Sequence, residues 1–284
     1  MPRITIVEMG PRDGLQNQSR LIPTAEKIHL VDLLSAAGFA RIETSSFVSP
    51  KWVPQLADAA EVFAGINRNP HTRYTALTPN MQGYGAARKA GADEVAVFGS
   101  ASESFSQKNI NCSIAESLAR FAPIMDAART DGIPVRGYVS CVTDCPFEGA
   151  IAPEAVARVT QALLDMGCYE VSLGDTIGHG TPETVEAMLK AVLEIAEPSQ
   201  LAGHFHDTKS RALENIETAL GQGVCVFDAS VAGLGGCPYA PGASGNVATE
   251  AVFDLMRTKK LETGIDPNAL AKAVDFACKL REPP

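Results

Sequence analysis

Short β-branched runs alternate regularly with longer amphipathic segments along this chain, and few folds accommodate such a pattern. The eight runs that we predict as strands are Ile4–Val7, Arg41–Glu43, Thr72–Ala76, Glu94–Phe98, Val135–Val139, Glu170–Leu173, Leu201–His206 and Val226–Val231. The segments between them are rich in Ala, Leu and Glu, and several begin at Pro and end at Gly, as helices do. The clearest predicted helices are Thr24–Ala37, Pro54–Asn67, Ile114–Thr130, Pro153–Met166, Pro182–Ala196 and Ser210–Gly221. This succession of strand–helix units predicts an α/β fold, a (β/α)8 TIM barrel.

A doubly wound open sheet is the alternative fold. That fold requires a glycine-rich phosphate loop after its first strand, whereas residues 8–14 are charged. No linker, low-complexity segment or change of composition divides the chain, so we expect residues 1–284 to form a single catalytic barrel domain. Residues 265–284 are predicted to add a short C-terminal helical extension.

Charge and cysteine content narrow the class of protein. The chain has 24 Lys and Arg against 33 Asp and Glu, a formal net charge of −9, which argues against nucleic-acid and anionic-membrane partners. No apolar run approaches the roughly 18 residues of a membrane span. The first residues show no targeting leader, so we expect a cytoplasmic protein. Most of the 7 cysteines are then expected to be reduced and buried.

Polar residues near the predicted carboxyl ends of strands indicate where the chemistry lies, because barrel enzymes place their sites there. His204 and His206 are two positions apart on one strand, so both imidazoles share a face and can bind one ion. The first strand is predicted to end at Arg12 and Asp13, which barrel closure brings near the histidines. With Asn246 from a later loop, these N and O donors favour Mg²⁺ or Mn²⁺ over zinc. Hydrogen-bonded histidines with cap or turn residues are the competing interpretation.

The segment 233–246 is a glycine-rich loop with Cys237 near its middle. A thiol in a loop over the predicted site can give or take a proton. Phosphate binding is disfavoured, because the loop lacks the Lys-Ser/Thr of a P-loop. Glu43 is expected at the end of the second strand as a cap or as a salt-bridge partner of Arg12 or Arg41. Asp175, which ends the sixth strand, is expected to support the site.

Four motifs carry a resemblance that extends over essentially the whole chain. They are Glu8–Asn17, Ser46–Gln55, Lys108–Ser113 and Gly233–Asn246. Together they resemble the 3-hydroxy-3-methylglutaryl-CoA lyase family. The Arg-Asp pair and the two histidines are shared with a wider superfamily of metal-dependent carbon–carbon lyases and Claisen-type synthases. The cysteine loop and the Ser-Phe-Val-Ser-Pro-Lys-Trp stretch are more specific to the lyases.

The resemblance implies a (β/α)8 enzyme that cleaves 3-hydroxy-3-methylglutaryl-CoA to acetyl-CoA and acetoacetate. It implies that Asp13, His204, His206 and Asn246 hold the divalent ion. It further implies that Arg12 offsets the negative charge on the thioester oxygen and that Cys237 protonates the enolate carbon. Glu43 and Glu250 are implied to support Arg12 and the loop. Asn109 is implied to contact the pantetheine arm. Asp13 and His204 both stay candidates for the base that deprotonates the substrate hydroxyl. An acyl-CoA substrate and a homodimer are the partners that the resemblance implies.

Two other functions stay open at this point. A sister enzyme of the same superfamily, such as a 4-hydroxy-2-oxo acid aldolase or an isopropylmalate- or homocitrate-type synthase, would share the Arg-Asp pair and the histidines. The synthases usually carry a long C-terminal regulatory region, which is not seen in this sequence. A non-catalytic protein that binds metal or acyl-CoA is the third hypothesis, and the joint presence of Arg12, Asp13 and Cys237 argues against it.

Overall fold

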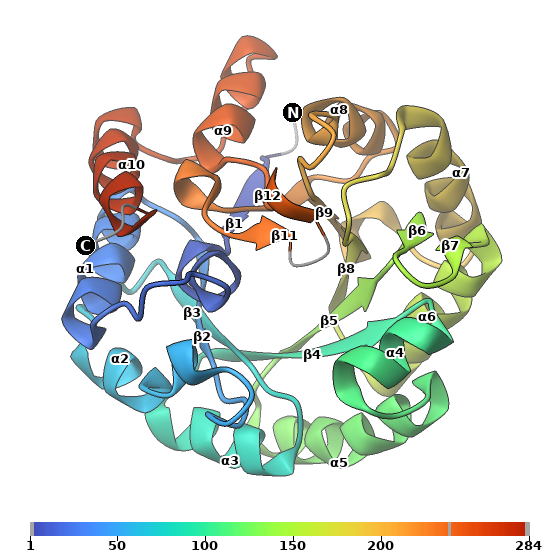
Figure 1. Cartoon of the computed structure of the whole chain (residues 1–284), viewed down its shortest axis with the longest axis horizontal. Coiled ribbons are helices and arrows are strands. Elements are labelled where there is room, and N and C mark those ends of the chain that lie inside the picture. The colour runs from blue at the N-terminus through green and yellow to red at the C-terminus, as the bar shows by residue number, and fades with distance from the viewer. Residues whose placement is uncertain (1–2, 238–239, 282–284) are drawn as a thin grey trace.

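The strands of the barrel are all parallel and close on themselves in the computed structural model (Figure 1). The structure describes residues 3–237 and 240–281. The strands, in their order around the barrel, are β1 (Thr5–Glu8), β2 (Arg41–Ser46), β3 (Arg73–Leu77), β4 (Glu94–Ser100), β5 (Val135–Ser140), β8 (Glu170–Asp175), β9 (Leu201–Phe205) and β10 (Val226–Ala229). The predicted (β/α)8 TIM barrel is therefore confirmed.

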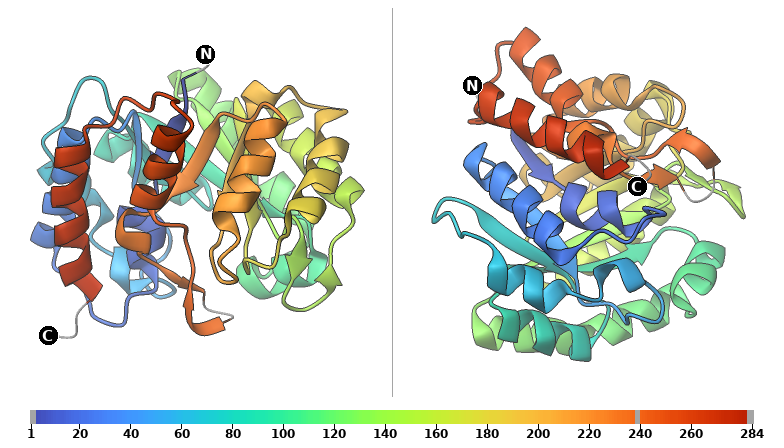
Figure 2. Two further views of the ribbon diagram at one scale, coloured as in Figure 1. Left: turned by 90° about the horizontal axis from the view of Figure 1, so that it is seen from above. Right: turned by 60° about the vertical axis from the view of Figure 1, so that its left-hand side comes forward.

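Helices surround the barrel on its outer side (Figures 1 and 2). They are α1 (Thr24–Ala36), α2 (Ala59–Gly65), α3 (Met81–Ala90), α4 (Glu103–Ile110), α5 (Ile114–Asp131), α6 (Pro153–Met166), α7 (Pro182–Leu193), α8 (Ala212–Gly221), α9 (Thr249–Thr258) and α10 (Pro267–Arg281). The start of α5 is fixed by a capping box, in which Ser113 and Glu116 bind each other's backbone N–H groups. The additional helix α10 packs beside α1.

The first strand leads into a turn before Arg12 and Asp13 are reached. β1 stops at Glu8, and Gly10–Gly14 forms a π-helical turn with a proline in its first turn. The Met9 carbonyl accepts the backbone N–H groups of Arg12 and Asp13 in this turn. The prediction that Arg12 and Asp13 end the strand is therefore wrong, because the turn takes both residues out of the strand.

The predicted helix Pro54–Asn67 is also wrong as a single element. Pro54–Leu56 forms a short 3-10 turn, and α2 begins only at Ala59. Between them the carboxylate of Asp58 accepts a hydrogen bond from Lys27 Nζ of α1 at 2.7 Å. This contact ties the connecting residues to a neighbouring helix, and a local hydrophobic pattern carries no information about such a contact.

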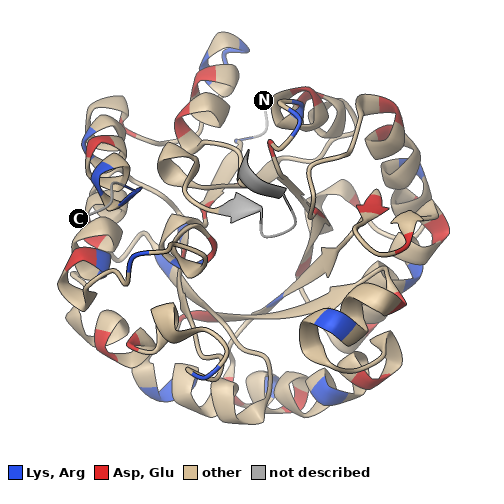
Figure 3. Ribbon diagram, in the orientation of Figure 1, with Lys and Arg blue, Asp and Glu red and all other residues tan. Residues whose placement is uncertain are grey.

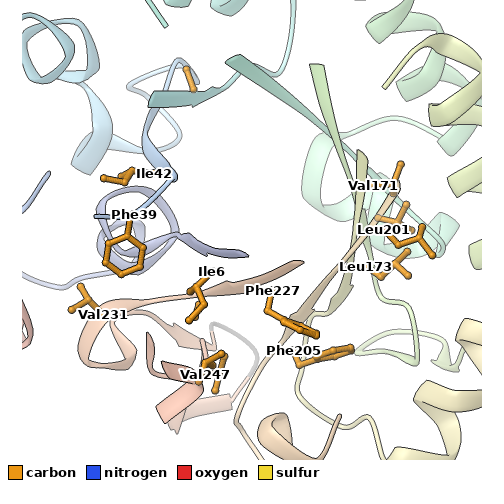
Figure 4. Packing of buried hydrophobic residues seen from close by; sticks show 14 of the residues in the cluster. Ile6, Phe39, Ile42, Val171, Leu173, Leu201, Phe205, Phe227, Val231 and Val247 are labelled. Carbon is orange, nitrogen blue, oxygen red and sulfur yellow. The ribbon is translucent and has the colours of Figure 1, made fainter. Parts of the chain in front are cut away.

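The two faces of the strands differ in polarity. Outward-facing residues such as Ile6, Ile42 and Leu173 belong to the main hydrophobic core beneath the helices (Figure 4). Inward-facing residues include Arg136 and Asp228, whose side chains are at most 1% exposed and are paired with each other at 2.8 Å. The lumen therefore contains paired charged groups where barrels more often hold branched aliphatic side chains.

Two hairpins follow strands of the barrel at their carboxyl ends. They are β6 (Asp144–Cys145) with β7 (Gly149–Ala150), and β11 (Gly236–Cys237) with β12 (Ala240–Ser244). Basic and acidic residues are both spread over the outer helices (Figure 3). Within residues 3–237 and 240–281, no helix combines the length and the apolar character that a membrane crossing needs.

Candidate active site

Three groups that can bind a metal ion converge at the carboxyl end of the barrel. Asp13 comes from the turn after β1, His204 from β9, and His206 follows β9 directly. One ligand atom of each residue lies within 4.8 Å of the other two. The Nε2 atoms of the histidines are 3.2 Å apart, and His204 Nε2 is 4.0 Å from Asp13 Oδ2. Two imidazole nitrogens this close repel each other unless a proton or a cation lies between them, so the donor set fits a divalent ion.

Asn246 lies against the same group. Its side-chain Nδ2 donates to Asp13 Oδ2 at 2.8 Å, and its backbone pairs with His206 in an isolated antiparallel bridge. The amide oxygen and nitrogen share one carbon, so rotation of the amide can present the oxygen to a cation. The structure thus brings together all four residues that the sequence analysis assigned to one ion.

A buried carboxylate orients His204. Asp228 Oδ2 is 3.2 Å from His204 Nδ1, accepts the hydroxyl of Ser172 at 2.7 Å, and pairs with Arg136. A carboxylate on Nδ1 fixes the ring and directs Nε2 toward the site. Burial lowers the pKa of His204, but the hydrogen bond and charge of Asp228 raise it above its ordinary value. Burial and the neighbouring His204 lower the pKa of His206 to about 4, so His206 is neutral at pH 7.

Arg12 is held in place by two carboxylates. Its Nε donates to Glu43 Oε2 at 2.7 Å, its Nη2 lies 2.6 Å from the same oxygen, and its Nη1 contacts Asp13. The guanidinium carries five N–H donors in a fixed plane, so donors are left for a ligand. Burial raises the pKa of Asp13, but the charge of Arg12 and the two histidines lower it to about 2. Asp13 is therefore ionised and paired across the physiological range.

The other residues that the sequence analysis singled out lie around this cluster. Glu250 in α9 accepts the backbone N–H of Ala232 at 3.0 Å. Asp175, at the end of β8, accepts the Gly180 N–H at 2.8 Å and holds the loop before α7. Asn109 lies exposed on α4. Cys237 lies in β11, and its side chain is outside the described part of the chain.

Sequence reasoning missed the charged groups inside the barrel. Arg136 and Tyr138 of β5 connect the two halves of the site, because Tyr138 OH donates to Glu43 Oε1 at 3.2 Å and Arg136 pairs with Asp228. The available signal was a charged residue inside a predicted strand, flanked by outward-facing apolar residues. In a parallel barrel such a residue must face the lumen, where it needs a partner of opposite charge.

Glu8 is another buried carboxylate to which the sequence pattern assigned no role. Its Oε1 accepts the N–H groups of Gly10 and Val231 at 2.8 and 2.9 Å, and its Oε2 accepts the Thr249 hydroxyl at 2.7 Å. Burial raises the pKa of Glu8 to about 7, although these hydrogen bonds lower it. Glu8 therefore joins the turn that carries Arg12 to the chain after β10 and to α9.

We expect Glu8→Gln to remove part of the pH dependence of stability. The folded-state pKa of about 7 lies above the ordinary value of 4.5. The contribution of Glu8 to stability is therefore full below the unfolded-state pKa and is lost as the pH rises through 7. The loss is on the order of 3 kcal/mol, from 1.36 kcal/mol per pKa unit. Urea unfolding between pH 4.5 and 8 should show a steeper decline for the unsubstituted protein, and parallel curves would contradict the expectation.

The barrel, the polar lumen and the cluster at its carboxyl end define an enzyme of the (β/α)8 class with a candidate metal centre. The family model described as HMGL-like matches residues 3–276. A relative from Bos taurus, named hydroxymethylglutaryl-CoA lyase, mitochondrial, is 57% identical and covers 98% of this chain and 85% of its own.

Two solved structures are also similar to this chain. The HMG-CoA lyase from Brucella melitensis has a TM-score of 0.98 at 59% identity and covers 99% of both chains. An HMG-CoA lyase from Acinetobacter baumannii, in complex with coenzyme A and 3-methylmalate, has a TM-score of 0.93 at 38% identity and covers 98% of this chain and 91% of its own. The chain belongs to the HMGL-like family and is a carbon–carbon lyase. The sister aldolases and synthases are not favoured by these relatives.

Proposed function

We propose that this chain cleaves 3-hydroxy-3-methylglutaryl-CoA to acetyl-CoA and acetoacetate. The observation that carries the proposal is the meeting of Arg12, Asp13, His204 and His206 at the carboxyl end of the barrel, in a chain whose relatives are named for this reaction. The reaction removes the proton of a tertiary hydroxyl and breaks the bond between C2 and C3. The electron pair of that bond passes to the thioester as an enolate, which then takes a proton on carbon.

Asp13, His204, His206 and Asn246 would hold a divalent cation, which we propose to be Mg²⁺ or Mn²⁺. When bound, such an ion supplies Lewis acidity that lowers the pKa of a coordinated hydroxyl and fixes carboxylate oxygens. Imidazole nitrogens, a carboxylate and an amide oxygen suit these harder ions better than thiolates would. The hydrogen bond from Asp228 keeps the His204 ring aligned for this role.

Arg12 would stabilise the negative charge that develops on the thioester oxygen. Glu43 pins the guanidinium before substrate binds, so the donors need little reorganisation during the reaction. Tyr138, which donates to Glu43, keeps that carboxylate in place. Glu43 is thus proposed as the residue that positions Arg12.

Two proton transfers complete the reaction. Asp13 and His204 are both candidates for the base that takes the hydroxyl proton, because both lie at the cluster. Cys237 is proposed to protonate the enolate carbon, which becomes the methyl group of acetyl-CoA. Its loop would cover the substrate and exclude water, which would otherwise quench the enolate. Asp175 and Glu250 would hold the loops around the site.

An acyl-CoA substrate is supported by the coenzyme A bound in a solved lyase of the same family. We propose that Asn109, exposed on α4, contacts the pantetheine arm. One continuous domain over residues 1–284, a homodimer and a cytoplasmic location stay predictions.

Metal removal gives a direct test of the proposed centre. We expect dialysis against a chelator to abolish release of acetoacetate from the CoA thioester, and added Mg²⁺ or Mn²⁺ to restore it, because the substrate hydroxyl is otherwise too weak an acid. The reaction is followed by acetoacetate formation, with the metal content of each sample measured in parallel. Full activity in a sample shown to be metal-free would overturn the assignment.

A further inference from the structure

The residues Val231–Gly233, at the base of the glycine-rich loop, are bound by three titratable side chains from three different elements. Glu8 of β1 accepts the N–H of Val231 at 2.9 Å, and Glu250 of α9 accepts the N–H of Ala232 at 3.0 Å. Arg281, the last residue of α10, donates to the carbonyl of Gly233. Three consecutive residues thus each have a backbone group bound by a titratable side chain.

The backbone at this point needs such support. Ala232 has a φ of 55°, in the left-handed region that residues with a Cβ rarely adopt. A conformation of this kind persists only where its surroundings hold it. Ala232 is buried, and Gly233 beside it also has a positive φ of 57°. Glu250 binds the N–H of Ala232 itself, and Glu8 and Arg281 bind the residues on either side of it.

The next two residues, Leu234 and Gly235, lie close to the proposed metal ligands and to the turn that carries Asp13. A Cβ placed on Gly235 would lie 2.8 Å from Asn246 Nδ2 and 3.4 Å from the carbonyl oxygen of Asp13. A Cβ placed on Gly14 would lie 2.8 Å from Leu234 Cβ. Glu8 also binds the N–H of Gly10, in the turn that carries Asp13. Movement of the loop base would therefore change the spacing between Asp13 and Asn246.

We propose that Glu8 and Arg281 are positioning residues that act together with Glu250 as a clamp on Val231–Gly233. The clamp sets where Asn246 meets Asp13 and where the loop with Cys237 begins. The proposal rests on the proposed function, because the roles of Asp13, Asn246 and Cys237 come from it. It also gives the C-terminal helix α10 a part in the site, through its last residue.

Arg281→Met tests the clamp with little risk to the fold, because Arg281 is exposed at the end of the last helix. The matched control is Lys279→Met, which removes one positive charge from the same exposed turn. We expect hydrogen exchange of residues 230–236 in the resting protein to become about tenfold faster in Arg281→Met only. We expect kcat to fall about tenfold, with KM changed less than twofold, since small misplacements of reacting groups slow the chemical step.

Glu8 gives an independent test by rescue. Glu8→Gln keeps an oxygen for the two N–H groups and should retain kcat within about threefold, whereas Glu8→Ala should lose about a hundredfold. If Glu8→Ala fails to fold, the comparison of Arg281→Met with Lys279→Met alone decides whether the clamp exists. Unchanged exchange in Arg281→Met, or faster exchange with unchanged kcat, overturns the clamp. Failure of the proposed function shows instead as absence of acetoacetate from the unsubstituted enzyme, which the exchange measurement does not depend on.

Discussion

Arg12→Gln should lower kcat by a factor of about 10²–10³ while leaving the fold and the metal content unchanged. Glutamine cannot carry the charge that offsets the developing enolate, although it can still hydrogen-bond Glu43. One preorganised donor of this kind is typically worth about 3–4 kcal/mol of transition-state stabilisation. Steady-state kinetics with the CoA thioester, alongside circular dichroism and metal analysis, measures the effect.

The matched control for this variant is Arg88→Gln. Arg88 pairs with Asp131 on the outside of the barrel, and its side chain is 60% exposed, so its loss should leave kcat unchanged. Arg12→Lys adds a second comparison, because lysine keeps the charge but loses the planar fork that binds Glu43 and Asp13 together. A variant Arg12→Gln that changes only KM would refute the role in transition-state stabilisation.

Cys237→Ser should keep metal and substrate binding and lose most of the turnover. A serine hydroxyl is a far weaker acid than a thiol, and general acids contribute factors of about 10²–10⁴ to such steps. We expect kcat to fall by a factor in that range. Binding of Mn²⁺ and of a non-cleavable CoA thioester should be retained, because Cys237 is not among the groups proposed to hold either.

Cys278→Ser serves as the control for Cys237→Ser. Cys278 is exposed on α10, so its substitution should change neither kcat nor binding. A near-native kcat in Cys237→Ser would remove Cys237 from the reaction. The acid would then have to be sought among the groups that face the metal cluster.

The sequence predicts the barrel well because each strand–helix unit carries its own local signals. The helical period of the apolar residues, together with the placement of Pro and Gly, suffices to predict the helix Pro153–Met166 with both ends correct. Local signals fail where a distant contact decides the path of the chain. Asp58 is bound to Lys27 of the preceding helix, and this contact delays the start of α2. Likewise, no local signal in the sequence distinguishes the π-helical turn at Gly10–Gly14 from the end of a strand.

The site could be predicted in part for the same reason. His204 and His206 share one segment, and Asp13 and Asn246 follow from closure of the barrel. The groups that orient His204 come from other strands: Asp228 lies on β10, and Arg136, which pairs with it, lies on β5, which is not adjacent to β10 in the barrel. Arg136 lies 92 positions from Asp228 along the chain, so no spacing in the sequence links the two residues. Such a pairing becomes visible only when the strand order is known.

The charged lumen also determines the route by which substrate enters and products leave the enzyme. Arg136, Glu170 and Asp228 are buried inside the barrel and are joined by ion pairs, and Asp228 contacts His204. Opening a second passage through the barrel would require breaking these buried ion pairs, which costs free energy, so we expect no passage there. Substrate and both products must then use the carboxyl-end mouth. Acetoacetate, formed next to the cluster, would leave by the same route as the larger thioester product, and product-inhibition kinetics measures the order in which the two depart.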